Sequence, residues 1–212
     1  MSCNSNKLFM KKIFIIIFYL IFIFKSEAFA RTRIILFGDS LMAGYGLTKP
    51  DHLSEALKFE LKNLNIESEI INGSVSGDTT KGGLNRIGWT LEEKANLVIL
   101  GLGANDMLRG IDPNEIKGNL NQIILKIKAK NIPIILAGFI APESYGKNYK
   151  EKFDNIYPSL AKEHNLILMP FLLQDVALNP KLNLEDGKHP NRDGVKVIAK
   201  NLTPYLVKQL KK

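Results

Sequence analysis

Cysteine is almost absent from this chain. Its one cysteine, Cys3, falls within the first thirty residues, so residues 31–212 contain none. That part of the chain therefore forms no disulfide bond, and it offers neither a catalytic thiolate nor a thiolate ligand for a metal ion.

Histidine is scarce, and several motifs of common enzyme classes are missing. The three histidines, His52, His164 and His189, are scattered and form no H-E-x-x-H pattern, which argues against a transition-metal site. No G-x-S-x-G occurs, so the nucleophile elbow of the α/β-hydrolases is absent, and there is no Walker A motif. The segment "GLGAND" has Asp106 where a dinucleotide-binding fingerprint needs its third glycine. We therefore expect no metal and no organic cofactor.

The one long apolar run lies close to the N-terminus. Three lysines precede the apolar residues 13–24, and the small-residue pattern "AFA" follows at 28–30. This order predicts a secretory signal peptide, residues 1–30, cleaved after residue 30. An uncleaved membrane anchor is the alternative, but twelve helical residues span only about 18 Å of a hydrocarbon core of roughly 30 Å. We expect residues 31–212 to be a single domain that is periplasmic or secreted in a bacterium.

Positive charge is in excess but is not concentrated. The formal net charge is +8, and the first thirty residues hold four lysines and one glutamate, so residues 31–212 carry about +5. The lysines are spread along helical patterns such as "IKGNLNQIILKIKAK", which is typical of a solvated helix face. No basic stripe with interleaved aromatic residues appears, so we expect no nucleic-acid partner. A transient contact with an anionic membrane surface stays open.

Apolar runs alternate with helical patterns along the whole of residues 31–212. Because the apolar runs are nearly continuous, they predict strands buried on both faces, and hence a parallel sheet between two helix layers. Ser54 is a candidate helix cap, and Pro204 predicts a bend or a restart in the last helix. Strands are predicted at 33–38, 67–72, 96–103, 132–139 and 166–171, and helices at 54–64, within 79–94, and at 112–130, 149–164 and 191–210.

Polar residues follow the first three predicted strands at their carboxyl ends, where open parallel sheets bind ligands. Ser40 follows the first strand, and its local sequence does not decide between a nucleophile and the commoner helix cap or turn residue. A nucleophilic serine needs a base, and His189 in "EDGKHPN" has Asp186 three residues ahead. That carboxylate can accept a hydrogen bond from Nδ1 and leave Nε2 free for a proton. The segment is also plausible as a plain turn, and His52 and His164 have adequate interpretations as surface residues at helix ends.

Acyl transfer also needs hydrogen-bond donors for the oxyanion that develops during the reaction. Backbone N–H groups near Gly77 can approach a ligand closely, and Asn105 adds a side-chain amide after the third strand. A capping turn is the alternative explanation of "GAND".

Four blocks, in this order, carry a resemblance that covers most of residues 31–212. They are "FGDSL" around Ser40, "SGDTT" around Gly77, "LGAND" around Asn105, and "DGKHPN" with Asp186 and His189. The sequence resembles the SGNH (GDSL) hydrolase family. "NGSVSGDTTKGGLNRI" and "APESYGKNY" are similar to its bacterial thioesterase I, lysophospholipase and arylesterase branch.

The resemblance implies an α/β fold, a flavodoxin-like three-layer α/β/α domain with a five-stranded parallel sheet. It implies Ser40, Asp186 and His189 as the catalytic triad. It also implies an oxyanion hole formed by the Ser40 N–H, the Gly77 N–H and the Asn105 side chain, with no cofactor. We expect Asp39 to hold the turn through the neighbouring backbone.

The resemblance implies esters and thioesters of acyl chains as substrates, such as lysophospholipids and small aryl esters, hydrolysed through an acyl-enzyme. We expect the enzyme to be a monomer. Two alternatives stay open. One is a carbohydrate O-deacetylase on the same fold, and the other is a non-catalytic lipid-binding module.

Overall fold

The computed structural model describes residues 31–211, so the predicted signal peptide at 1–30 lies outside the described residues. Within them, five strands form one sheet in the order β2-β1-β3-β4-β5, with every neighbouring pair parallel. This is the flavodoxin-like strand order, and it confirms the predicted fold class. The strands are β1 Thr32–Gly38, β2 Ser68–Asn72, β3 Leu97–Gly101, β4 Ile134–Ala137 and β5 Ile167–Met169.

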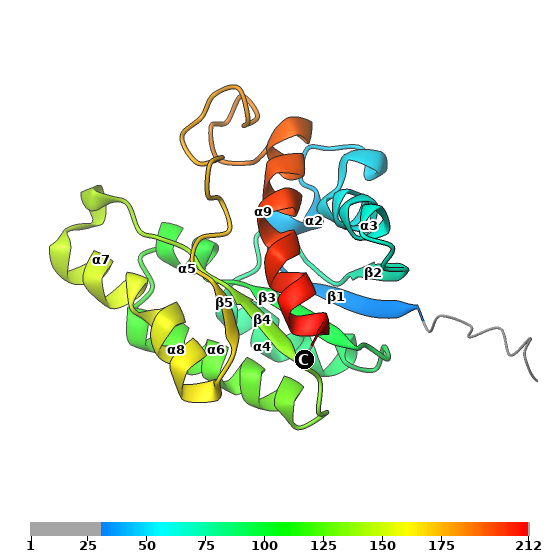
Figure 1. Cartoon of the computed structure of the whole chain (residues 1–212). Helices are drawn as coiled ribbons and strands as arrows, with labels where there is room; N and C mark the ends of the chain where they lie inside the picture. Colours follow the sequence, from blue (N-terminus) through cyan, green and yellow to red (C-terminus); the bar gives the residue numbers. More distant parts are fainter. Residues whose placement is uncertain (1–30, 212) are drawn as a thin grey trace, which may run out of the picture. The chain divides into compact units, whose positions relative to one another are not determined.

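Helices cover both faces of the sheet. On one face α3 (Leu53–Asn63) packs against α9 (Arg192–Leu210), and on the other α4 (Thr80–Thr90), α6 (Pro113–Lys128) and α8 (Ile156–His164) lie in a row (Figure 1). The apolar residues of β1 and β3 are fully buried because helices cover both sides of these central strands. The remaining short elements are α2 Ser40–Ala43, η1 Lys49–Asp51, α5 Ala104–Leu108, η2 Glu143–Tyr145 and α7 Lys147–Asp154.

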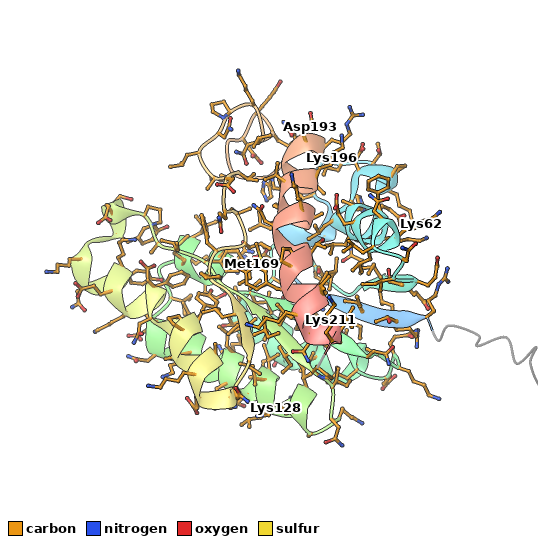
Figure 2. The ribbon with its side chains drawn as sticks, in the orientation of Figure 1. Lys62, Lys128, Met169, Asp193, Lys196 and Lys211 are labelled. Atoms are coloured by element: carbon orange, nitrogen blue, oxygen red, sulfur yellow. The ribbon has the colours of Figure 1, made fainter. Side chains whose placement is uncertain are left out.

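Charged side chains lie on the solvent side of the outer helices. Lys62 on α3 and Lys128 on α6 are exposed, and Asp193 and Lys196 project from the first turns of α9 (Figure 2). The Lys196 ammonium lies 2.9 Å from Asp193 Oδ1, one turn away. On α6 the isoleucines are buried while Lys126 and Lys128 are exposed, so its lysine-rich stretch is an amphipathic helix with a solvated face.

The predicted helix over 149–164 is wrong, because the chain forms two helices there. α7 ends at Asp154 and α8 begins at Ile156. Pro158 lies in the first turn of α8, where a proline is tolerated. In a continuous helix its ring would collide with the carbonyl group of Asp154, four residues earlier.

Two smaller expectations also change. α9 runs as one helix through Pro204 and does not restart, and Thr203 Oγ1 donates to the Ala199 carbonyl in the preceding turn. Ser54 is not a cap, because α3 already begins at Leu53 and buries Ser54. Among the described residues, no helix is both long and apolar enough to cross a bilayer.

Candidate active site

Ser40 lies at the carboxyl end of β1, where the chain turns into α2. A Cβ atom on Gly38 would lie 2.8 Å from the Gly101 carbonyl oxygen of the neighbouring strand, so only glycine fits this approach. Asp39 caps α2, and its Oδ1 accepts a hydrogen bond from Leu41 N–H at 3.0 Å. Ser40 is then the first residue of α2, at the edge of the sheet where ligands bind.

Ser40, His189 and Asp186 lie in one hydrogen-bonded line. His189 Nε2 is 2.9 Å from Ser40 Oγ, and His189 Nδ1 is 2.6 Å from Asp186 Oδ2. The other carboxylate oxygen of Asp186 accepts the backbone N–H groups of Lys188 and His189, at 2.9 and 3.0 Å. A carboxylate against Nδ1 keeps the proton on that nitrogen, which leaves the lone pair of Nε2 directed at the serine hydroxyl.

Asp186 is held as an anion. The backbone N–H groups of His189 and Lys188, followed by the His189 ring, lower the pKa of this carboxyl well below its usual range. Asp186 therefore stays ionised at any pH at which a neutral imidazole is available.

Asn105 links the segments that carry the other two expected oxyanion donors, Ser40 and Gly77. Within residues 31–211 the backbone N–H groups of Ser40 and Gly77 have no acceptor, and Gly77 has a φ of +81° that favours glycine. Asn105 Nδ2 donates to Asp39 Oδ2 at 3.2 Å and to the Asp78 carbonyl at 3.0 Å. Asn105 therefore bridges the residue before Ser40 and the residue after Gly77. Both of its amide hydrogens already have acceptors, so an oxyanion must share one of them.

The burial of Asp39 and its contact with Asn105 were not foreseen from the sequence. The expected bond to the neighbouring backbone is present, but the side chain is also fully buried and accepts from the Asn105 amide. Burial raises the pKa of Asp39 to about 6. Nothing local in "FGDSL" indicates this contact, because Asn105 is 66 residues away in the chain.

Arg86 is a second residue that sequence reasoning missed. From α4 its guanidinium donates to Asp78 Oδ2 at 2.6 Å, to the Gly38 carbonyl at 3.1 Å, and to the Gly73 carbonyl. It also lies 4.1 Å from the centroid of the Phe37 ring. One side chain thus joins the end of β1 to the loop after β2, the two segments that carry the serine and Gly77.

A cavity of about 550 Å³ opens beside Ser40 and His189. This is within the usual range for a small-molecule site. Its walls come from α5 and from the segments after β4 and β5, and they are mainly apolar. The apolar lining residues are Leu41, Ala104, Met107, Leu108, Phe139, Ile140, Ala141, Pro142, Phe171, Leu173, Ala177 and Leu178.

The other two histidines lie apart from this line, and both are partly buried rather than simple surface residues. His52 Nε2 is 3.2 Å from the Leu47 carbonyl, and His164 Nε2 is 2.6 Å from Asn121 Oδ1. Each ring gains a polar partner, which explains why its burial is tolerated. In the described part of the chain, no cluster of three His, Cys, Asp or Glu side chains could hold a metal ion.

Comparison with known proteins identifies the family of this chain. The profile of the GDSL-like lipase/acylhydrolase family matches residues 36–197. An arylesterase of Vibrio mimicus is 36% identical over 192 residues, covering 90% of this chain and 96% of that protein. The thioesterase 1/protease 1/lysophospholipase L1 of Escherichia coli K12 is 36% identical over 185 residues, covering 87% of this chain and 86% of that protein.

A solved structure is similarly close. AlinE4, described as an SGNH-hydrolase family esterase, is 41% identical and superposes with a TM-score of 0.72, covering 85% of this chain and 97% of that one. These matches span nearly the whole of the described residues and agree in naming ester hydrolases. The chain therefore belongs to the GDSL-like lipase/acylhydrolase (SGNH) family and is an ester-hydrolysing enzyme.

Proposed function

We propose that Ser40, His189 and Asp186 hydrolyse carboxylic esters of acyl chains through an acyl-enzyme. The observation that carries this is the line of short contacts from Asp186 to His189 to Ser40 beside an apolar cavity. As Ser40 Oγ attacks the ester carbon, its proton passes to His189 Nε2, and the carbonyl electron pair moves onto oxygen. When the intermediate collapses, the bond to the leaving alcohol breaks and the imidazolium protonates that alcohol. Water then repeats the cycle and releases the acid.

The developing oxyanion accepts from the N–H groups of Ser40 and Gly77 and from the Asn105 amide. The two backbone donors have no other acceptor among residues 31–211, so binding an oxyanion costs them no existing bond. Asp39 and Asp78 hold the Asn105 amide between these donors. Donors held in place before reaction stabilise the transition state without reorganisation.

The substrate class follows from the cavity walls. Twelve apolar residues line the space beside the serine, and three large ones, Leu108, Ile140 and Leu178, are also exposed. An acyl chain can fill such a space and gain about 0.8 kcal/mol per buried methylene. The names of the relatives, arylesterase and thioesterase 1/lysophospholipase L1, support small aryl esters, acyl thioesters and lysophospholipids as substrates.

The cavity walls argue against one alternative, and the intact triad argues against the other. A carbohydrate O-deacetylase needs a polar cleft for sugar hydroxyls, whereas this cavity offers mainly alkyl and aromatic surface. A non-catalytic lipid-binding module has no use for an intact line from Asp186 to Ser40.

We further propose that residues 31–212 are the mature enzyme, released from the signal peptide 1–30 into the periplasm or the medium, where it acts as a monomer. The basic, apolar and small-residue order of the first thirty residues supports this. Exposed Leu108, Ile140 and Leu178 at the cavity support a transient contact with a lipid surface.

A chain-length series tests the proposal. With p-nitrophenyl esters from acetyl upward, we expect kcat/KM to rise by roughly fourfold per methylene until the cavity is filled.

Ser40→Ala and His189→Ala should each remove nearly all activity, while His164→Ala, the matched control, should stay within a few-fold of wild type. Lysophospholipid and an acetylated sugar are assayed in parallel. Highest activity on acetyl groups would favour the deacetylase, and full activity of His189→Ala would contradict the proposed base.

A further inference from the structure

The ring of His189 lies next to Tyr45, a residue with no role in the hydrolysis proposed above. Its two nitrogens face Ser40 and Asp186, and Tyr45 lies against its ring. The centroids of the Tyr45 and His189 rings are 4.3 Å apart, with 35° between their planes. This separation is shorter than most aromatic contacts, so the tyrosine restricts how far the imidazole can tilt.

The loop that carries the tyrosine is shaped for this approach. Gly44 and Gly46 both have positive φ, +89° and +71°. A Cβ atom on Gly44 would lie 2.3 Å from the His52 ring, and one on Gly46 would lie 2.7 Å from Leu184 Cδ1. Leu184 belongs to the loop of His189, since its N–H donates to the His189 carbonyl at 2.8 Å. Gly46 thus lets the Tyr45 loop approach the His189 loop, while Gly44 fits the turn against the His52 ring.

The exposure of Tyr45 argues that the fold does not need its side chain. Tyr45 is 50% exposed. Its hydroxyl group makes no hydrogen bond to another residue within the described residues 31–211. The ring face, and not the hydroxyl, is therefore the part of this side chain that meets the site.

We propose that Tyr45 is a positioning residue for His189. Its ring holds the imidazole with Nε2 directed at Ser40 Oγ, and its π face stabilises the positive charge that the imidazole gains in the transition state. The inference rests on the proposed role of His189 as the base. Because the charge forms only after substrate has bound, the contribution of Tyr45 belongs to kcat and leaves KM unchanged.

Two substitutions of Tyr45 separate the ring from the hydroxyl. Tyr45→Phe keeps the π face, so we expect kcat within about twofold of wild type. Tyr45→Leu keeps an apolar side chain but has no π face, so we expect kcat on a short p-nitrophenyl ester to fall by roughly tenfold, with KM and Tm unchanged. Phe59→Ala, which removes an aromatic ring 63% exposed on α3, is the matched control and should leave kcat as it is.

NMR supplies a readout that overall stability does not affect. The carbon-bound ring protons of His189 lie in the ring current of Tyr45, so their resonances should move in Tyr45→Leu and stay in place in Tyr45→Phe. Unchanged kcat in Tyr45→Leu, a loss that appears in KM instead, or an equal loss in Tyr45→Phe would overturn the inference. Failure of the proposed function is distinguishable, because it would appear as full activity of His189→Ala, whatever the result at Tyr45.

Discussion

Asp39 shows how one buried carboxyl can serve a site at a cost in stability. It is fully buried, caps α2 and accepts a bond from Asn105. Burial raises its pKa to about 6 from the ordinary 3.8. Between these values the folded protein holds a proton that the unfolded chain releases, so this group makes the protein less stable as pH rises from about 4 to 6.

Asp39→Asn should remove this dependence. Asparagine caps α2 as well as aspartate does and does not titrate. Relative to the variant, the wild type should lose up to about 3 kcal/mol of unfolding free energy between pH 4 and 7, since one pKa unit corresponds to about 1.4 kcal/mol. Urea unfolding of both proteins at four pH values measures this difference. Parallel curves would mean that Asp39 titrates normally in the fold.

Asn105→Ala tests the side-chain donor of the proposed oxyanion hole. A donor that acts mainly in the transition state should lower kcat by about 10²–10³ and change KM little. The substitution also leaves buried Asp39 Oδ2 without its partner, so we expect unfolding free energy to fall by about 1–3 kcal/mol at pH 7. Kinetics and melting on the same preparation separate the two effects. Near-normal kcat with a lower Tm would leave Asn105 as a scaffold residue.

At the scale of elements, Arg86 connects three parts of the fold. α4 supplies the guanidinium, and the ends of β1 and β2 supply the Gly38 and Gly73 carbonyl oxygens. The planar fork of arginine donates in several fixed directions, which a lysine ammonium cannot reproduce. The relative placement of Ser40 and Gly77 therefore depends on a helix that supplies neither of them.

Arg86→Met should lower the free energy of unfolding by at least about 3 kcal/mol, because hydrogen bonds to a charged group contribute about 1.5–3 kcal/mol each. Arg33→Met is the control. Arg33 pairs with Glu69 and Glu93, which are about half exposed, so its loss should cost much less than the loss of Arg86. Urea unfolding of both variants gives the comparison, and equal losses would show that the Arg86 contacts contribute no more than a surface pair.

At the scale of the whole molecule, the chain divides into a short N-terminal segment and one folded domain. The family match at residues 36–197 and the five-stranded sheet both fall within the second part. A mature protein that begins at residue 31 would therefore keep every strand, the serine loop and the His189 loop. β1 begins at Thr32, immediately after the proposed cleavage point.

Export of the full chain in a bacterial host should give a product with Arg31 at its N-terminus. The reason is the small-residue pattern at 28–30 after a short apolar segment. N-terminal sequencing of periplasmic or secreted material identifies the first residue. Recovery of protein that still begins with Met1 would favour the uncleaved anchor.

Local patterns determined most of the architecture. Near-continuous apolar strands alternating with amphipathic helices have few stable arrangements other than a parallel sheet between helix layers, and the observed sheet is of that kind. The sequence also determined that Ser40, Gly77 and Asn105 lie at one sheet edge, because parallel strands end together. Asp186 and His189 are three residues apart, so their contact is a local property of one turn.

Tertiary structure alone decided which distant groups meet. The contact of His189 with Ser40 joins residues 149 positions apart. The bond from Arg86 on α4 to Gly38 and the bond from Asn105 on α5 to Asp39 join elements that are distant in the sequence. The break between α7 and α8 and the approach of Tyr45 to His189 likewise depend on packing. Sequence periodicity reports which face of an element is buried, but not which side chain lies opposite. The partners of Asp39 and Arg86, the shape of the cavity and the neighbour of the His189 ring are set only when the layers pack.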